Sequence, residues 1–229
     1  MVKKLKSFWS QYNFIVIFLG IFLIYLAING SQTTWTSVTN IFLHSAILGT
    51  IALGMGMIIL TGDIDLSVGS SFVLAGGLTI LFFNKVNSIF LALVMAVLLG
   101  AVFGLINGIL VGKFRMPAFI VTLATMLIYR SISQYMMNEL GQTRYSVDAT
   151  LSKYQPLFQF GNGNFLTISY IALVFLAVAL LLIYVTTSTK YGKRVYALGS
   201  NEKAALLAGV NVVWTRISVF VLCGACTGL

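Results

Sequence analysis

The chain has 229 residues, of which 59% are hydrophobic and only 8% are charged. Soluble globular domains carry roughly 25% charged residues, so this composition excludes an ordinary soluble domain and indicates an integral membrane protein. The formal net charge of +9 could suggest a nucleic-acid partner, but the 14 basic residues are distributed among short segments rather than gathered in one patch. Membrane topology explains them better than nucleic-acid binding does.

Long, continuously apolar runs predict an all-α fold, a single polytopic bundle of transmembrane helices, because lipid forces backbone polar groups to pair within each segment. A hydrocarbon core about 30 Å thick takes roughly 20 residues per helix, so a chain of this length can supply about six or seven spans. A β-barrel would need alternating segments of about ten residues. The runs in this chain are longer than that.

In chain order, the apolar runs are separated by short polar segments. The first run follows Lys3, Lys4 and Lys6, a signal-like start, but no Ala-x-Ala-like cleavage site follows, so we expect a retained span. The polar segment 138–164 is predicted to be an external loop, and 188–213 a cytoplasmic loop. The predicted spans are 14–28, 41–60, 66–83, 89–111, 117–137 and 165–185, with a seventh apolar run that starts near residue 216.

The distribution of Lys and Arg between alternate sides predicts that the N-terminus is cytoplasmic, because cytoplasmic segments of membrane proteins are enriched in these residues. With this orientation the external side receives only Lys85, Arg144 and Lys153. The same orientation places residues 60–71 at the cytoplasmic ends of the second and third spans. The basic residues on the cytoplasmic side are then Lys3, Lys4, Lys6, Lys113, Arg115, Lys190, Lys193, Arg194 and Lys203, with Arg216 at its edge.

Residues 60–71 interrupt the apolar runs with two acids, Asp63 and Asp65. An Asp at the centre of a membrane helix costs about 2.5 to 3.5 kcal/mol on insertion scales, so these acids require an interface, a water-filled cavity or partners. One interpretation is structural: Gly62 ends one helix, Asp63 or Asp65 caps the next, and both acids face cytoplasmic water. The other is that the break lines or gates the inner mouth of a pathway, and a broken helix can do both. The candidate pathway residues are Asp63, Asp65, Ser67, Asn107 and Thr122.

The fourth predicted span contains a row of glycines at intervals of four, with Asn107 beside the row. Steps of four drift only slowly around a helix, so the glycines form one groove into which another helix can pack closely. We expect a role in helix packing rather than in transport itself. The row consists of Gly100, Gly104, Gly108 and Gly112.

The segment 199–211 is predicted to contain a short helix, which Asn201 can cap and which Gly209 can end with a left-handed turn. Glu202 favours the positive end of such a helix. Its small alanines and its two leucines, Leu206 and Leu207, allow two interpretations. The helix lies on its own bundle, or it inserts as a knob into a groove of a partner.

No credible catalytic set is found in the sequence, neither Ser-His-Asp nor Cys-His. There is also no Gly-x4-Gly-Lys-Ser/Thr phosphate-binding loop, so if transport uses ATP, another chain must bind it. His44 has no second histidine with which to share a metal. Cys223 and Cys226 lie inside an apolar run, where we expect small packing residues. The sequence therefore predicts neither an enzyme nor a metal site.

Three blocks of this sequence resemble the membrane permeases of ribose-type sugar ABC importers, a family that also serves xylose, galactose and related solutes. Residues 61–70, Thr-Gly-Asp-Ile-Asp-Leu-Ser-Val-Gly-Ser, are similar to the family's signature Thr-Gly-Gly-Ile-Asp-Leu-Ser-Val-Gly-Ser, with Asp63 in place of the second glycine. Residues 104–108 with 116–125 are similar to the next block, and 191–205 with Gly209 to the cytoplasmic loop. The three blocks follow the family's order.

The resemblance implies a permease of the bacterial plasma membrane that imports a monosaccharide such as ribose by alternating access. It implies three kinds of partner: a second permease copy, a cytoplasmic ATPase that binds ATP and Mg²⁺, and an extracytoplasmic sugar-binding protein. This chain would bind no cofactor itself. Family members carry further C-terminal spans, so a chain that ends in mid-helix at Leu229 looks truncated.

The cytoplasmic block is similar to the Glu-Ala-Ala…Gly coupling motif of ABC importers, although Lys203 interrupts the motif and no Leu-Pro follows it. The resemblance therefore implies that this helix docks the ATPase. The coupling residues that it implies are Asn201, Glu202, Lys203, Ala204, Ala205, Leu206 and Gly209.

The alternative is an ion-coupled secondary transporter of a small polar solute, which Asp63, Asp65 and Arg130 would favour. It predicts uptake driven by a proton or sodium gradient without an ATPase. A membrane enzyme or a non-transporting anchor is disfavoured by the lack of a credible catalytic set.

Overall fold

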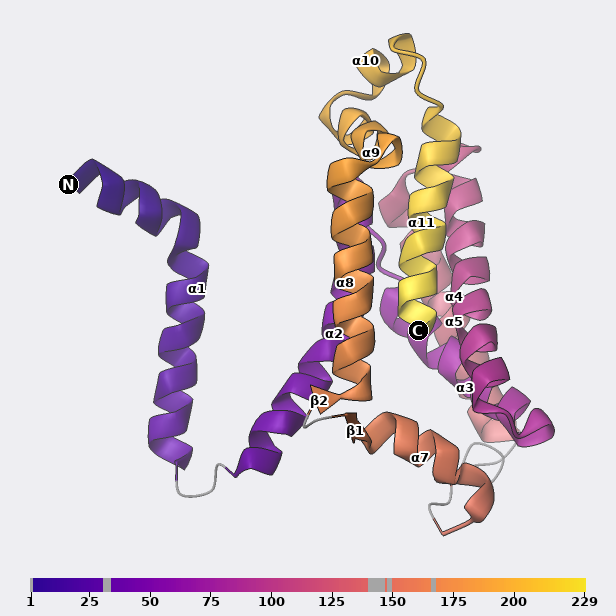
Figure 1. Cartoon of the computed structure of the whole chain (residues 1–229). Coiled ribbons are helices and arrows are strands. Elements are labelled where there is room, and N and C mark those ends of the chain that lie inside the picture. Colours follow the sequence, from indigo (N-terminus) through magenta and orange to yellow (C-terminus); the bar gives the residue numbers. More distant parts are fainter. Residues whose placement is uncertain (1, 31–33, 140–146, 148–149, 166–167) are drawn as a thin grey trace. The chain divides into compact units, whose positions relative to one another are not determined.

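The computed structural model in Figure 1 describes residues 2–30, 34–139, 147, 150–165 and 168–229. Nearly all of its regular structure is helical, which confirms the predicted all-α fold. The chain divides into two units, Met1–Leu43 and His44–Leu229. The first contains α1 (Val2–Asn29) and the first part of α2 (Trp35–Leu60). The candidate site lies wholly within the second.

The second unit contains the rest of α2 and all later elements. In chain order these are α3 (Val68–Val86), α4 (Ile89–Gly112), α5 (Ala118–Glu139), the 3₁₀ helix η1 (Ser152–Tyr154), α7 (Gln155–Asn162), β1 (Asn164–Phe165), β2 (Ile168–Ser169), α8 (Tyr170–Ser188), α9 (Lys190–Ser200), α10 (Glu202–Leu207) and α11 (Val212–Gly228).

Five helices among the described residues are long and apolar enough to cross a membrane, and each corresponds to one of the predicted spans. The predicted fifth span also forms a helix, α5, but it is not among these five, because residues such as Arg130 and Gln134 make its second half more polar. α11 is a shorter apolar helix of 17 residues. The cytoplasmic placement of the N-terminus stays a prediction. The five spans are Tyr12–Asn29, Ser37–Leu60, Val68–Val86, Ile89–Gly112 and Tyr170–Ser188.

The described part of the predicted external loop is not irregular, because η1 and α7 form within it. The Tyr154 hydroxyl donates to Asn84 Oδ1 at 2.7 Å, and the Tyr154 ring lies 6.0 Å from that of Phe83. These contacts hold η1 against the C-terminal end of α3. The predicted loop residues Arg144 and Asp148 lie outside the described residues.

The sixth predicted span starts later than expected. The antiparallel strands β1 and β2 pair Asn164 with Ser169 and Phe165 with Ile168. α8 therefore begins only at Tyr170, where the Ser169 hydroxyl accepts a hydrogen bond from the backbone N–H of Ile171 at 3.2 Å.

Two helices, α9 and α10, occupy most of the segment predicted as a cytoplasmic loop. α9 was not predicted, and it packs into the bundle through Val195 and Leu198, which are buried. α11 begins at Val212 rather than near residue 216, because Asn211 caps it and accepts a hydrogen bond from the Trp214 N–H at 3.0 Å. The loop is therefore a packed part of the fold from which only α10 stands out (Figure 1).

α4 and α11 lie in direct backbone contact along the predicted row of glycines. A Cβ atom added at Gly100 would collide with the carbonyl oxygen of Gly224, and one at Gly104 with that of Phe220. A Cβ at Gly108 would lie 2.9 Å from the Ile217 carbonyl oxygen. Gly112 ends the row, where a Cβ would lie 3.0 Å from Val213 O. These contacts place all four glycines of the row against α11, and their packing role stays a prediction that a substitution can test.

Replacing Gly104 with Ala should destabilise the bundle, because the added methyl group has no space against the backbone of α11. Overpacking of this kind costs about 1–3 kcal/mol of unfolding free energy. Gly76→Ala is the matched control, since no heavy atom lies within 4 Å of the Cβ it would add. Thermal unfolding in detergent measures both variants, and equal unfolding temperatures would contradict the packing role of the row.

Candidate functional site

The break between α2 and α3 begins with a local stop signal. The Thr61 hydroxyl donates to the Ile58 carbonyl oxygen at 2.7 Å, and Gly62 has a φ of 81°. This left-handed conformation suits a residue without a Cβ, so Gly62 ends the helix as predicted. The chain then runs through residues 63–67 before α3 starts at Val68.

Asp65 turns into the bundle rather than toward water. Its side chain is buried, with 4% of the residue exposed. Asp65 Oδ1 accepts hydrogen bonds from the Ser67 hydroxyl at 2.6 Å and from the Ser67 backbone N–H at 2.8 Å. Ser67, and neither acid, is the N-cap residue of α3. The predictions that Asp63 or Asp65 caps α3 and that both acids face water were therefore wrong, because neighbouring helices cover the break.

Asn107 of α4 completes a buried polar cluster with Asp65 and Ser67. Its side-chain amide donates to the Ser67 hydroxyl at 2.8 Å and to Asp65 Oδ2 at 3.4 Å. Thr122 of α5 donates to the Ala118 carbonyl oxygen at 2.8 Å and also lies 3.4 Å from the carbonyl oxygen of Ile64, within the break. Four of the five candidate pathway residues thus come together around the break, and Asp63 stands apart. Their role in a pathway stays a prediction.

Burial raises the pKa of the Asp65 carboxyl above its ordinary value of 3.8, against the opposing effect of the hydrogen bonds from Ser67 and Asn107. In the part of the chain that the structure describes, Asp65 has no cationic partner. The three hydrogen bonds hold the carboxyl in place, and burial disfavours its charge.

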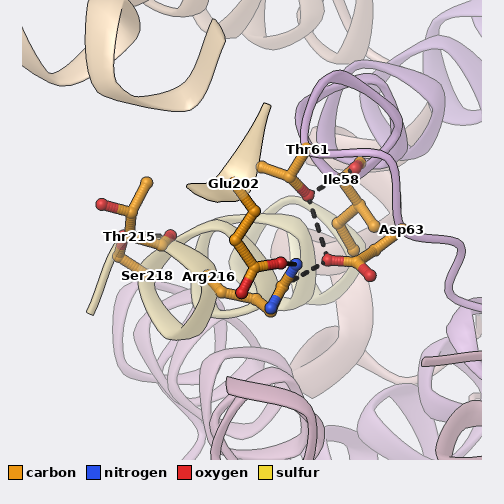
Figure 2. Close-up of polar contacts among 7 residues, drawn as sticks. All are labelled: Ile58, Thr61, Asp63, Glu202, Thr215, Arg216 and Ser218. Atoms are coloured by element: carbon orange, nitrogen blue, oxygen red, sulfur yellow. Dashed lines mark hydrogen bonds and ion pairs between the residues drawn. The ribbon is translucent and has the colours of Figure 1, made fainter. Parts of the chain in front are cut away.

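Asp63 forms an ion pair with Arg216, a residue that was not among the predicted site residues. Figure 2 shows Arg216, on α11, between Asp63 and Glu202. Arg216 Nε donates to Asp63 Oδ2 at 2.7 Å, and Arg216 Nη2 donates to Glu202 Oε2 at 3.1 Å. The Thr61 hydroxyl, which donates to Ile58, also lies 3.3 Å from the same Asp63 oxygen. The sequence held one signal for this pairing. Arg216 begins an apolar run on the predicted cytoplasmic side, where Asp63 and Asp65 had no assigned cationic partner.

α10 has the caps that the sequence predicted. Asn201 Oδ1 accepts a hydrogen bond from the Ala204 N–H at 3.0 Å, and Gly209 follows the helix with a φ of 79°. Glu202 is its first residue. Local chemistry therefore sets both ends of α10.

The exposed face of α10 differs in part from the predicted one. Ala205 is buried against its own chain, so it cannot present a surface to a partner. Leu206 and Leu207 are 61% and 89% exposed, and Lys203 and Ala204 are exposed as well. Beside α10 lies a hollow of about 580 Å³ whose lining includes Glu202, Lys203, Leu206, Gly209, Arg115 and Arg216.

The raised pKa of Asp65 makes the stability of the folded protein depend on pH. The folded state holds this proton more tightly than the unfolded chain, so the contribution of Asp65 to the unfolding free energy is greatest below pH 3.8 and falls as the pH rises through the raised pKa. Asp65→Asn keeps an oxygen for the Ser67 hydrogen bonds but cannot titrate. We expect the difference in unfolding temperature between parent and variant to change as the pH rises above 3.8. A constant difference would contradict the assignment.

Comparison with known proteins identifies the family of the chain. Residues 37–229 match the family described as branched-chain amino acid transport system / permease component. This match includes the break, the glycine row and α10. A family of permease components agrees with the prediction of a transporter subunit that is not an enzyme.

Several curated relatives are sugar permeases. The L-arabinose ABC transporter permease protein AraH of Azospirillum brasilense is 33% identical over 192 residues, which are 84% of this chain and 54% of the relative. The ribose import permease RbsC of Bacillus subtilis is 35% identical over 216 residues, 93% of this chain and 65% of the relative. RbsC of Escherichia coli is 31% identical over 225 residues, 98% of this chain and 68% of the relative.

The chain spans 54% of the length of the first of these relatives and 68% of the third. No solved structure matches it. With the five candidate spans, these matches establish an integral membrane protein, and they confirm the predicted resemblance to ribose-type permeases. The chain belongs to the permease-component family of the branched-chain amino acid transport systems, in the group that contains the ribose-type sugar permeases.

Proposed function

We propose that this chain is a membrane-spanning permease subunit of an ABC importer for a monosaccharide such as ribose, in the plasma membrane of a bacterium. The relatives named for ribose, arabinose and allose support a sugar as the solute. The exposed helix α10 is the observation that carries the proposal, because it provides a place for an ATPase to act.

α10 suits docking because its apolar side chains point away from the bundle. Leu207 is 89% exposed on a helix that stands beyond the ends of α9 and α11 (Figure 1). Apolar side chains on a helix surface are the usual anchors when a helix lies in a groove of a partner. The partner in this proposal is a cytoplasmic ATPase, which binds ATP and Mg²⁺.

In the proposed mechanism, ATP binding closes the ATPase and moves α10, and the bundle shifts between outward-facing and inward-facing states. α9 is buried in the bundle through Val195 and Leu198, so it can carry such a movement inward. A second permease copy would complete the pathway, and an extracytoplasmic binding protein would deliver the sugar. Asn107 Oδ1, which is buried and has no hydrogen-bond partner among the described residues, supports a place for Asn107 beside that pathway.

An ion-coupled carrier is the competing proposal, and the buried Asp65 favours it, because a protonatable group inside a membrane bundle often serves ion coupling. The other two residues that suggested a carrier, Asp63 and Arg130, give it less support. Asp63 is paired with Arg216 rather than with Arg130, and Arg130 is exposed on α5. The two proposals differ in their energy source, which an uptake experiment separates.

The test is uptake of labelled ribose, arabinose and allose by the permease reconstituted into liposomes with its ATPase and binding protein. The importer proposal expects uptake that needs hydrolysable ATP and persists when ionophores collapse the proton and sodium gradients. Uptake that ionophores abolish and that proceeds without an ATPase would establish the carrier instead.

Leu207→Glu should weaken binding of the ATPase about 30-fold, because a charged side chain would replace an apolar anchor worth about 2 kcal/mol. Copurification of the ATPase and ATP-driven uptake measure the loss. Leu151→Glu is the matched control, since Leu151 is also exposed, at 52%, but lies in the predicted external segment. Unchanged ATPase binding by Leu207→Glu would remove α10 as the docking helix.

A further inference from the structure

We propose that Arg216 is a positioning residue that ties α10 to the break between α2 and α3, so that movement of the docking helix reaches the break directly. The proposal rests on the proposed function insofar as α10 is the helix on which the ATPase acts. The tether, which consists of the ion pairs of Arg216 with Asp63 and Glu202, is a property of the permease alone and can be tested separately.

The geometry joins three separate parts of the chain through one side chain. Arg216 lies on α11, Asp63 lies in the break 153 residues earlier, and Glu202 is the first residue of α10. The two carboxylates bind different nitrogens, Nε and Nη2, so the guanidinium holds both at once (Figure 2). Both salt bridges found in the described part of the chain are made by Arg216.

The two halves of the tether differ in exposure. The side chains of Arg216 and Asp63 are each 14% exposed, whereas that of Glu202 is 52% exposed. Salt screens exposed ion pairs much more than partly buried ones. The Asp63 half is therefore the lasting anchor. The Glu202 half is the part that can release.

α10 needs such an anchor because it is too short to hold its own position. It has six residues, and isolated helices shorter than about 12 residues are marginal in water. Ala205 packs it from one side, and the Glu202 pair holds its first turn. Asp63 is two residues from Asp65, whose hydrogen bonds reach Ser67 and Asn107. A displacement of Glu202 would thus be transmitted through Arg216 to Asp63, and along the break to the buried cluster around Asp65.

The identity of the cation matters in this arrangement. A guanidinium presents its donors in a rigid planar fork, whereas a lysine ammonium is a single point of charge on a flexible stem. Arg216→Lys would keep the charge but could not hold the two carboxylates in their present positions at once. It should therefore behave more like the neutral variant Arg216→Gln than like the parent.

The first experiment measures the mobility of α10 in the isolated permease. A spin label at Ala208→Cys reports it, because Ala208 is exposed and the native Cys223 and Cys226 are buried. We expect label mobility to rise in Arg216→Gln and in Glu202→Gln. In the parent it should also rise between about 50 mM and about 500 mM KCl, and this salt response should vanish in Glu202→Gln. A salt response that persists in Glu202→Gln, or mobility equal to the parent in both variants, would overturn the tether.

Arg115→Gln is the matched control, because Arg115 lines the same hollow but forms no salt bridge in the described ranges of the chain. It should leave mobility unchanged, and an increase equal to that of Arg216→Gln would overturn the assignment. If Arg216→Gln fails to fold, the mobility measured in Glu202→Gln decides the test, because that variant keeps the ion pair between Arg216 and Asp63.

The second experiment measures sugar transported per ATP hydrolysed in the reconstituted importer. We expect this ratio to fall about fivefold or more in Arg216→Gln and in Arg216→Lys, with ATPase binding retained. An unchanged ratio would overturn the transmission role. Failure of the proposed function gives a different pattern, in which no ATPase binds to the parent permease while the salt-dependent mobility of α10 persists.

Discussion

In the contact between α4 and α11, carbonyl oxygens of α11 occupy the space that Cβ atoms on α4 would otherwise fill. Helices in lipid have little hydrophobic reason to associate, so close van der Waals contact over small residues holds such a pair together. Asn107 lies on α4 beside Gly108, and Arg216 lies on α11 beside Ile217, which packs on Gly108. The close contact at the glycine row therefore fixes the backbone positions from which the side chains of Asn107 and Arg216 contact the break.

The two acids of the break, Asp63 and Asp65, have different surroundings although they are only two residues apart. Asp65 is buried, and burial disfavours the charge of its carboxyl against the opposing effect of the hydrogen bonds from Ser67 and Asn107. The Asp63 side chain is 14% exposed, and its carboxylate lies 2.7 Å from the Arg216 guanidinium. Residues that are two apart in an irregular segment can face different surroundings, which lets the break hold a neutralisable group and an ion pair together.

The same end of the bundle combines rigid and releasable contacts. α9 packs into the bundle through Val195 and Leu198 and α11 lies on α4, while α10 stands outside with an exposed apolar face and a half-exposed ion pair at Glu202. Local regions with few buried contacts are those that move most easily in a folded protein. In the proposed importer, an exposed helix on a packed base would receive the movement of the ATPase.

Features with local causes were predicted correctly from the sequence. Long apolar runs have few alternatives to helix in lipid, so the spans and their approximate limits followed. Gly62, Asn201 and Gly209 end or cap helices through their own backbone and side-chain chemistry. The glycine row predicted close packing because steps of four keep one face. Membership of the permease family also followed from blocks of sequence alone.

Only the tertiary structure decided which groups meet. Asn107 and Ser67 are separated by 40 residues, and Arg216 and Asp63 by 153, so these pairs form only when the bundle closes over the break. The same closure buried Asp65, which one interpretation of the sequence placed in water, and turned Ala205 inward. The sequence by itself determined the helices, their caps and the family, whereas the partners of each charge depended on packing between segments that are distant along the chain.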